Sequence, residues 1–268
     1  MPGLSDLVAA RLAQESARLR GQFAERGPCG TRHCTLDALL PDDLARQVAD
    51  AFPPSDTMRL MRSFREVSNT TKSFAHAGPL VQEALFAFQA PAVVRLVESI
   101  TGLRDQHPDP QLYAGGLSVM EKGHFLHPHI DNSHDAGRRH RTLNLLYYVT
   151  PGWRVEDGGH LQLWDARVRV PVTVPSLFNR LVIMETHRHS WHGVNAVRAG
   201  GGRKCVSNYY FSEHSPDGSP YFHVTSFSAP PDRPLLRMLA AADTAVRSAL
   251  RTFVPTGVGR TDVHRAGP

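Results

Sequence analysis

The chain has 268 residues, enough to bury a sizeable core, and we expect one domain with peripheral segments. It contains no stretch of 18 apolar residues and no basic N-terminal segment followed by an apolar run, which argues against a membrane span or a signal peptide. The net charge of +5 permits an anionic partner, but no block of like charges indicates a nucleic-acid-binding arm. With only three scattered cysteines and no disulfide framework, we expect a cytoplasmic protein without a membrane partner.

Residues 1–110 are predicted to form a helical and extended support region. Residues 1–26 have the apolar spacing of an amphipathic helix, which Gly27-Pro28 would end. Helical spacing returns at 42–52 and in two runs over 80–101, which meet at Pro91 and stop at Gly102. The polar segment between them, 53–79, is interpreted as an excursion that holds one strand.

The segment from Cys29 to Cys34 invites a zinc interpretation, because two cysteines and a histidine lie close together. A second pair of ligands at zinc-finger spacing is missing from the sequence. A loop that enters a strand is therefore the preferred interpretation.

Residues 111–230 change to short apolar runs divided by turn residues, which indicates a mainly β core with flanking helices. Eight short strands in this order favour a double-sheet jelly roll of the kind that cupins also use. The runs lie near 113–120, 124–131, 141–149, 160–164, 168–174, 180–186, 190–197 and 203–212. Helical periodicity returns over 231–254, and the tail at 255–268 is predicted to be disordered.

The first candidate metal ligands are His129 and Asp131, a His-x-Asp pair in the strand-rich part of the chain. Residues i and i+2 of a strand point to the same face, so the imidazole and the carboxylate can converge on one point. Such a pair is two thirds of the 2-His-1-carboxylate triad that binds non-haem Fe(II). A chain with 15 His and 25 acidic residues can also contain this pair by chance.

Three later histidines, His187, His189 and His192, are candidates for the third ligand. Arg203 follows His192 by eleven residues and opens a β-rich run whose odd positions share one face. A histidine, a glycine turn and an inward arginine would place a metal ligand beside a carboxylate clamp. Arginine suits the clamp because its planar fork binds carboxylates bidentately and keeps its charge when buried.

These residues belong to a series of five motifs in order: EKGHFLHPHID at 121–131, RTLNLLYY at 141–148, GGHL at 158–161, NRLV at 179–182, and WHGV at 191–194 followed by Gly202-Arg203. With them, segment 119–212 resembles the catalytic core of the prolyl-hydroxylase-like 2-oxoglutarate/Fe(II)-dependent dioxygenases. The resemblance covers about a third of the chain. It implies a double-stranded β-helix as the form of the jelly roll, buttressed by the N-terminal and C-terminal helices.

The resemblance also implies a set of site residues. The iron would be held by His129, Asp131 and His192, and Arg203 would bind the distal carboxylate of 2-oxoglutarate. The Tyr148 hydroxyl matches a family position that helps to bind this carboxylate. The remaining positions that match or share a face with the cosubstrate pocket are Asn144, Leu146, Leu161, Val194 and Ser207.

The sequence departs from the family pattern at Met120, where many relatives have Tyr, so that a cosubstrate contact is missing or replaced. His127 shares strand parity with His129 and Asp131, and it is either a substrate contact or an ordinary hydrogen-bonded histidine at the pocket mouth. The candidate substrate-contacting residues are His127, Asn132, His134 and Tyr209.

The implied cofactor is Fe(II), with 2-oxoglutarate and O₂ as cosubstrates and ascorbate as a candidate stimulant. The family couples oxidative decarboxylation of 2-oxoglutarate to succinate and CO₂ with oxidation of a C–H bond. Related halogenases lack the carboxylate ligand, so the presence of Asp131 favours hydroxylation. Desaturation and ring formation use the same ligands and stay open.

The leading hypothesis is a hydroxylase of a small molecule, such as an amino acid, a sugar or a biosynthetic intermediate. Hydroxylation of a protein side chain, of the prolyl type, is the alternative with the same chemistry. Nucleic acid is disfavoured as a substrate, because the demethylase branch carries a second arginine where this chain has Asn208, Tyr209 and Tyr210. From another class, a non-catalytic jelly-roll binding protein would have no need of Arg203. The sequence leaves the substrate and the oligomeric state undecided.

Overall fold

The computed structural model describes residues 2–71, 73–112, 115–135, 137–240 and 242–243. Its helices are α1 (Leu4–Ala24), α2 (Asp42–Asp50), α3 (Pro79–Ala87) and α4 (Pro91–Thr101), with 3-10 turns at Ser55–Thr57 and Val155–Asp157. Its strands are β1 (His33–Leu36), β2 (Arg59–Arg62), β3 (Glu66–Thr70), β4 (His107–Pro108), β5 (Gly116–Met120), β6 (Phe125–Ile130), β7 (His140–Tyr148), β8 (Leu161–Trp164), β9 (Pro171–Val174), β10 (Arg180–Glu185), β11 (His192–Val194), β12 (Arg203–Ser212) and β13 (Ser226–Phe227).

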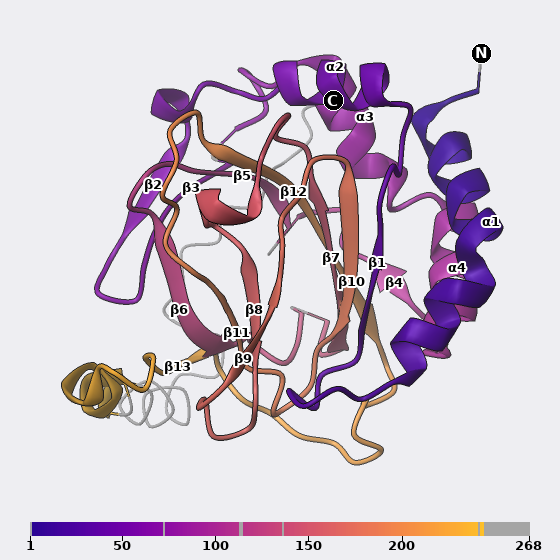
Figure 1. The fold of residues 1–268 in the computed structure, drawn as a ribbon. Coiled ribbons are helices and arrows are strands. Elements are labelled where there is room, and N and C mark those ends of the chain that lie inside the picture. Colours follow the sequence, from indigo (N-terminus) through magenta and orange to yellow (C-terminus); the bar gives the residue numbers. More distant parts are fainter. Residues whose placement is uncertain (1, 72, 113–114, 136, 241, 244–268) are drawn as a thin grey trace.

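These strands form one antiparallel sheet that curls on itself (Figure 1). One part has the order β1-β10-β7-β12-β5, and the other has the order β6-β11-β8-β9. Strand β3 joins them, because it pairs with both β5 and β6. The curled antiparallel sheet confirms the predicted jelly roll, and the eight predicted strands of the core all appear within a few residues of their expected bounds.

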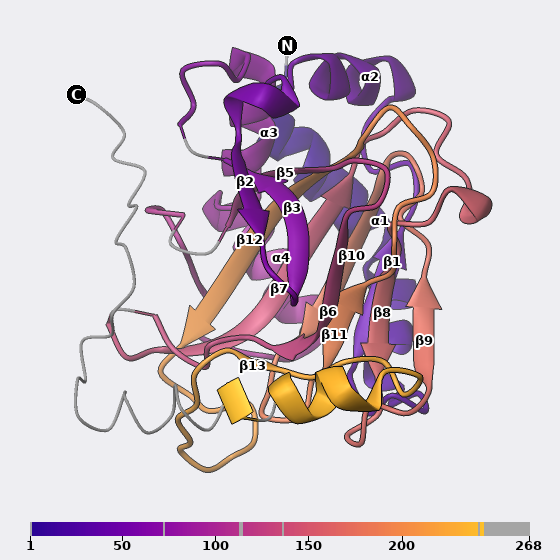
Figure 2. The ribbon, with the colours of Figure 1, turned by 90° about the vertical axis from the view of Figure 1, so that its left-hand side faces the viewer.

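Helices α1 and α4 cover the outer face of the larger sheet part (Figures 1 and 2). Their apolar stripes pack in one cluster with one face of β7, β10 and β12. Members of this cluster include Leu12, Leu19, Phe23, Leu85, Val97, Ile100, Leu145, Tyr147, Ile183 and Val206. Prolines at the first turns of α3 and α4 fix the starts of these helices, and Gly102 ends α4 in a left-handed conformation with φ of 72°.

Alternation along the strands divides the side chains between this core and the inside of the curl. On β7, Leu143, Leu145 and Tyr147 face the helices, whereas the intervening even-numbered residues face inward. On β12, Val206 and Tyr210 pack with the helices, and the odd-numbered residues 203–209 face inward. The period of two therefore places the predicted pocket residues on one surface, as expected from the sequence.

Segment 53–79 differs from the expected single strand. It forms a hairpin, with β2 paired to β3 from Arg59 opposite Thr70 to Arg62 opposite Val67. Among the described strands, β2 pairs with β3 alone and lies outside the main path of the sheet. Its four residues, RLMR, are too few to give a clear strand signal. The hairpin forms a wall of the central cavity.

The predicted C-terminal helix is helical at 234–240 and 242–243. Arg237 donates hydrogen bonds from Nη2 to the carbonyl oxygens of Arg167 and Val168. Leu235, Met238 and Leu239 are exposed. The rest of this helix and the predicted disordered tail at 255–268 lie outside the described residues.

The three cysteines are free and buried. Cys34 packs in the helix-side core, whereas Cys29 packs with Leu161 and Val182 inside the curl. No single described helix is both long and apolar enough to cross a membrane, although α3 and α4, bent by 45°, pass that test together. Each of these helices buries one face in the core.

The backbone of Gly193 on β11 packs against the backbone of β6, and this residue tests how tightly the two strands pack. A Cβ at this position would lie 2.6 Å from the backbone oxygen of Leu126, which cannot rotate away. We expect Gly193→Ala to lower the free energy of unfolding by about 1–3 kcal/mol, as overpacking does. Gly200→Ala is the control, because a Cβ there meets no atom within 4 Å. Equal stability of the two variants in denaturant unfolding would contradict this close packing.

Candidate metal centre and cosubstrate cavity

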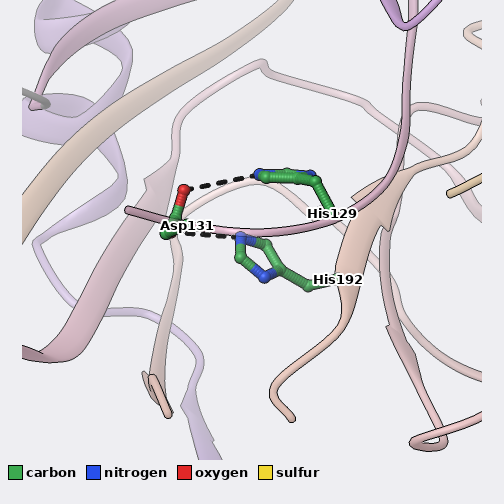
Figure 3. Close-up of side chains that lie close together, drawn as sticks. All are labelled: His129, Asp131 and His192. Carbon is green, nitrogen blue, oxygen red and sulfur yellow. Dashed lines mark ion pairs between the residues drawn. The ribbon is translucent and has the colours of Figure 1, made fainter. Parts of the chain in front are cut away.

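His129, Asp131 and His192 come together inside the curl of the sheet (Figure 3). His192 on β11 lies directly opposite His129 on β6, and Asp131 follows the end of β6. The Nε2 atom of His129 lies 3.5 Å from Oδ1 of Asp131, and Nε2 of His192 lies 3.4 Å from Oδ2. One ligand atom from each residue lies within 4.8 Å of the others.

The hydrogen bonds of both imidazoles prepare Nε2 for a metal. Nδ1 of His129 lies 3.1 Å from the carbonyl oxygen of His127, and Nδ1 of His192 lies 2.9 Å from that of Ser190. A carbonyl oxygen only accepts, so each Nδ1 must carry the proton in the neutral ring. Each Nε2 then presents its lone pair toward Asp131, which is the arrangement that metal-binding histidines use.

The neighbouring histidines of the sequence do not share this position. His189 is exposed. His187 is buried, and its Nδ1 accepts the backbone N–H of His189. Among the described residues, the triad is the single group of histidine, cysteine and acidic side chains that could hold a metal. Two imidazoles and a carboxylate are the donor set that suits Fe(II), so these residues fit the metal that the resemblance implies.

Arg141 contacts the triad, although sequence parity places it on the wrong face. Its Nη1 lies 3.0 Å from Oδ2 of Asp131, and Nδ2 of Asn144 donates to the same oxygen at 3.0 Å. The pairing of β7 with β12 shifts register beside Leu143, so that Thr142 is an extra residue. A bulge of this kind re-aims the side chains that precede it, which explains why alternation alone misses Arg141.

The charges around Asp131 keep it ionised. Burial would raise the pKa of this carboxyl, but Arg141 and the two imidazoles outweigh burial and hold the pKa well below its usual range. For His129, burial would lower the pKa, but the adjacent Asp131 outweighs it and raises the pKa. Arg141 is itself buried, with its guanidinium 4.4 Å from the centre of the Tyr209 ring. The charged donor Arg141 and the neutral donor Asn144 thus fix the orientation of the Asp131 carboxylate.

A cavity of about 370 Å³ lies next to the triad, and both of its histidines line it. All seven residues predicted for cosubstrate binding also line it: Asn144, Leu146, Tyr148, Leu161, Val194, Arg203 and Ser207. Met120 and Tyr209 do so as well. The structure therefore brings the predicted pocket together, from four different strands.

Arg203 is a buried cation of this cavity without a counter-ion among the described residues. Only 4% of it is exposed, its Nε has no hydrogen-bond partner, and it makes no ion pair with a described residue. Its guanidinium lies 5.2 Å from the centre of the Tyr148 ring. Burial of an unpaired guanidinium is costly, and a carboxylate ligand would remove that cost. Arg203 therefore fits the distal carboxylate of 2-oxoglutarate, and burial raises the pKa of the Tyr148 hydroxyl, which keeps it a neutral donor beside Arg203.

Of the candidate substrate-contacting residues, Tyr209 alone lines this cavity. His127 packs against Phe125 with ring centres 4.6 Å apart, and its backbone N–H donates to the carbonyl oxygen of Arg65. Asn132 donates from its side chain to the carbonyl oxygen of His134 and lines a second, much smaller cavity. His134 belongs to a cluster of rings with His140, Tyr221 and Phe222.

Sequence reasoning missed one wall of the cavity. The inward side chains of the β2–β3 hairpin line it: Arg59, Met61, Glu66, Ser68 and Thr70. The alternation of Glu66, Ser68 and Thr70 is the signal that could have revealed this face. It was weak because four of the five residues of β3 are polar, which suggests a solvated loop as readily as a strand.

A jelly roll that encloses a 2-His-1-carboxylate triad, with an unpaired buried arginine in the same cavity, has the features of a non-haem iron oxygenase. Residues 115–212 match the family model of the 2OG-Fe(II) oxygenase superfamily. This segment is therefore a 2OG-Fe(II) oxygenase domain, and the predicted family and enzyme class are confirmed. The family uses Fe(II), 2-oxoglutarate and O₂. A comparison with curated proteins gave no match.

Solved structures share the fold. A prolyl-4-hydroxylase from Pseudomonas putida has 20% identity and a TM-score of 0.52, over 74% of this chain and 99% of its own. A prolyl hydroxylase from Trichoplax adhaerens, in complex with a hypoxia inducible factor peptide fragment, has 18% identity and a TM-score of 0.52, over 76% and 92%. SnoN, an epimerase from nogalamycin biosynthesis, has 14% identity and a TM-score of 0.52, over 75% and 83%.

Arg141 gives a prediction about metal affinity. Arg141→Gln removes the charge behind Asp131 and should weaken divalent metal binding by about 10–100-fold, as loss of a hydrogen bond to a ligand does. Titration with Co(II) against a competing chelator would measure the change. Arg139→Gln is the matched control, because Arg139 pairs with Asp135 instead. An affinity that falls no further in Arg141→Gln than in this control would rule out the orienting role.

The ring cluster gives a prediction about pH. Burial, together with His140 and His223, lowers the pKa of His134 to about 4. Between pH 4 and the unfolded value of about 6.5, the unfolded chain therefore binds more protons, and stability falls as pH falls. We expect denaturant unfolding at pH 7.5 and pH 5 to show this loss, and His134→Gln to reduce it. A loss of the same size in the variant would show that His134 does not contribute.

Proposed function

We propose that the chain is a hydroxylase that oxidises an unactivated C–H bond of a small molecule, with 2-oxoglutarate as cosubstrate. One observation carries the proposal. The histidines of the triad and the unpaired Arg203 line the same cavity, so that a metal and a carboxylate-bearing cosubstrate can be held together.

Each residue has a part in that reaction. Bound Fe(II) and 2-oxoglutarate supply the activation of O₂, with release of succinate and CO₂. His129, Asp131 and His192 hold the metal, and Arg203 with Tyr148 orients the cosubstrate through its distal carboxylate. Leu146, Leu161 and Val194 give the cavity an apolar surface, which limits the water near the reacting atoms.

Asp131 supports hydroxylation over halogenation. A halogenase of this family leaves the carboxylate position open for a halide, whereas here Asp131 occupies it and is held by Arg141 and Asn144. Arg141 and Asn144 both bind Oδ2. Oδ1 has no such donor in the described residues and is the oxygen offered to the metal.

The size of the cavity supports a small substrate. At about 370 Å³ it lies at the lower end of the range for ligand sites, and the cosubstrate takes part of that volume. The β2–β3 hairpin covers one side of it, and β13 pairs with β6 next to His129. Hydroxylation of a protein side chain is the second candidate, favoured by the shared fold with prolyl hydroxylases. It requires an open groove for an extended peptide.

The test is anaerobic addition of Fe(II) and 2-oxoglutarate, followed by the weak visible absorption band of their complex. We expect the band in the wild-type protein and its loss in His129→Ala and Asp131→Ala. Arg203→Ala should retain metal binding and weaken 2-oxoglutarate binding by about 30-fold or more, since truncating one partner of a buried charge pair costs about 2–5 kcal/mol.

Lys204→Ala is the matched control for Arg203→Ala. Lys204 is the next residue along β12, points to the other face, and donates from Nζ to the carbonyl oxygen of Ala49. It should leave the affinity for 2-oxoglutarate unchanged. A folded wild-type protein without the band would refute the proposed function. An unchanged 2-oxoglutarate affinity in Arg203→Ala would refute the assignment of the clamp.

A further inference from the structure

Among the described residues that line the cavity, Glu66 is the acidic one. It is the first residue of β3, and the strand period places it in one inward row with Ser68 and Thr70. Its backbone pairs with Leu126 on β6, three residues before His129. Glu66 is thus at the end of the hairpin closest in register to the metal centre.

The contacts of the hairpin support this placement. The carbonyl oxygen of Arg65 accepts the backbone N–H of His127. The guanidinium of Arg65 lies 5.0 Å from the centre of the Phe227 ring, which stacks on His129 with ring centres 5.4 Å apart. The hairpin tip is therefore tied to the strand that carries the first metal ligand.

The Glu66 carboxylate has no partner within the described part of the chain. It accepts no side-chain hydrogen bond and makes no ion pair there, whereas Asp131 is held by Arg141 and Asn144. The adjacent Arg65 pairs with Asp243 at 2.8 Å instead. A partly buried carboxylate without a neighbouring cation lowers the stability of the fold, because burial removes part of its hydration. Stability alone therefore does not explain Glu66.

The other charged residues that line the cavity, Arg203 and Arg59, lie away from Glu66. Arg203 is at the cosubstrate position. Arg59 is opposite Thr70, four residues from Glu66 along the strand, which corresponds to about 13 Å at the usual rise. The side of the cavity nearest His129 therefore carries a negative charge from the hairpin, in addition to the triad.

We propose that the substrate is a small molecule that carries a protonated amine or a guanidinium, and that Glu66 binds this cation. The inference rests on the proposed function and narrows its substrate class. A charge-assisted hydrogen bond would hold the cation at Glu66, and the hydroxyls of Ser68 and Thr70 offer neutral partners to polar groups beside it. The C–H bond that is oxidised then lies close to the cationic group.

The experiment uses matched pairs of compounds. L-lysine, L-ornithine, L-arginine and glucosamine are offered to the Fe(II)- and 2-oxoglutarate-loaded enzyme, each with a counterpart that carries no cationic group: diacetyl-lysine, diacetyl-ornithine, Nα-acetyl-citrulline and N-acetylglucosamine. Succinate is measured. At least one cationic member should raise succinate formation above the substrate-free rate, and its neutral counterpart should not. Glu66→Gln should raise the KM for that compound by about 30-fold or more. Its affinity for 2-oxoglutarate should be unchanged.

Glu156→Gln is the control, because it removes an exposed carboxylate that pairs with Arg154 outside the cavity. Calorimetric titration of the same compounds into the metal-free protein supplies a readout that needs no turnover. Absence of the iron–cosubstrate band would refute the proposed function, while calorimetry would still decide the role of Glu66. Binding or turnover that favours the neutral compounds, no response to any of the amines, or an unchanged KM in Glu66→Gln would overturn the inference.

Discussion

Strands β7 and β12 place the apolar core on one face and the cavity on the other, because their side chains alternate. One face of this strand pair packs against α1, α3 and α4 through residues such as Leu145, Tyr147 and Val206. The other face carries Asn144, Tyr148 and Arg203 into the cavity. A slip of one residue in either strand would exchange the two faces, which would bury Lys204 in place of Arg203. The apolar core therefore fixes the site, since the same register serves both.

The metal centre depends on a departure from this regular alternation of side chains in β7. Regular pairing would direct Arg141 toward the helices, away from Asp131. The extra residue in β7 turns it toward Asp131 instead. The carboxylate gains a cation and an amide donor on one oxygen, and the other oxygen is left for a metal. The bulge in β7 thus sets the orientation of Asp131, which follows the end of β6.

The parts that could be predicted from the sequence share a physical reason. The β-core strands, the choice of His192 and the inward position of Arg203 follow from a period of two and from short spacings, which are local properties of the chain. The β2–β3 hairpin was harder, because the polar face of Glu66, Ser68 and Thr70 is explained only by the cavity that it covers. Arg141 could not be placed, since a bulge depends on the partner strand β12. His127 does not line the cavity with His129, because the pairing of β6 with β11 shifts register between Leu126 and His129.

Strand β3 joins the two parts of the sheet, because Glu66 and Val67 pair with β6 while Asn69 and Thr70 pair with β5. Among the described strands, β2 pairs with β3 alone. The two strands of the hairpin therefore differ in how much a substitution on them disturbs the sheet. Substitutions on β3 act on the closure of the whole sheet as well as on the cavity wall, whereas a substitution of Met61 acts on a strand with a single described pairing partner. New specificities within this architecture are expected to arise first on the outer strand, with the inner strand following only after stability has been gained elsewhere.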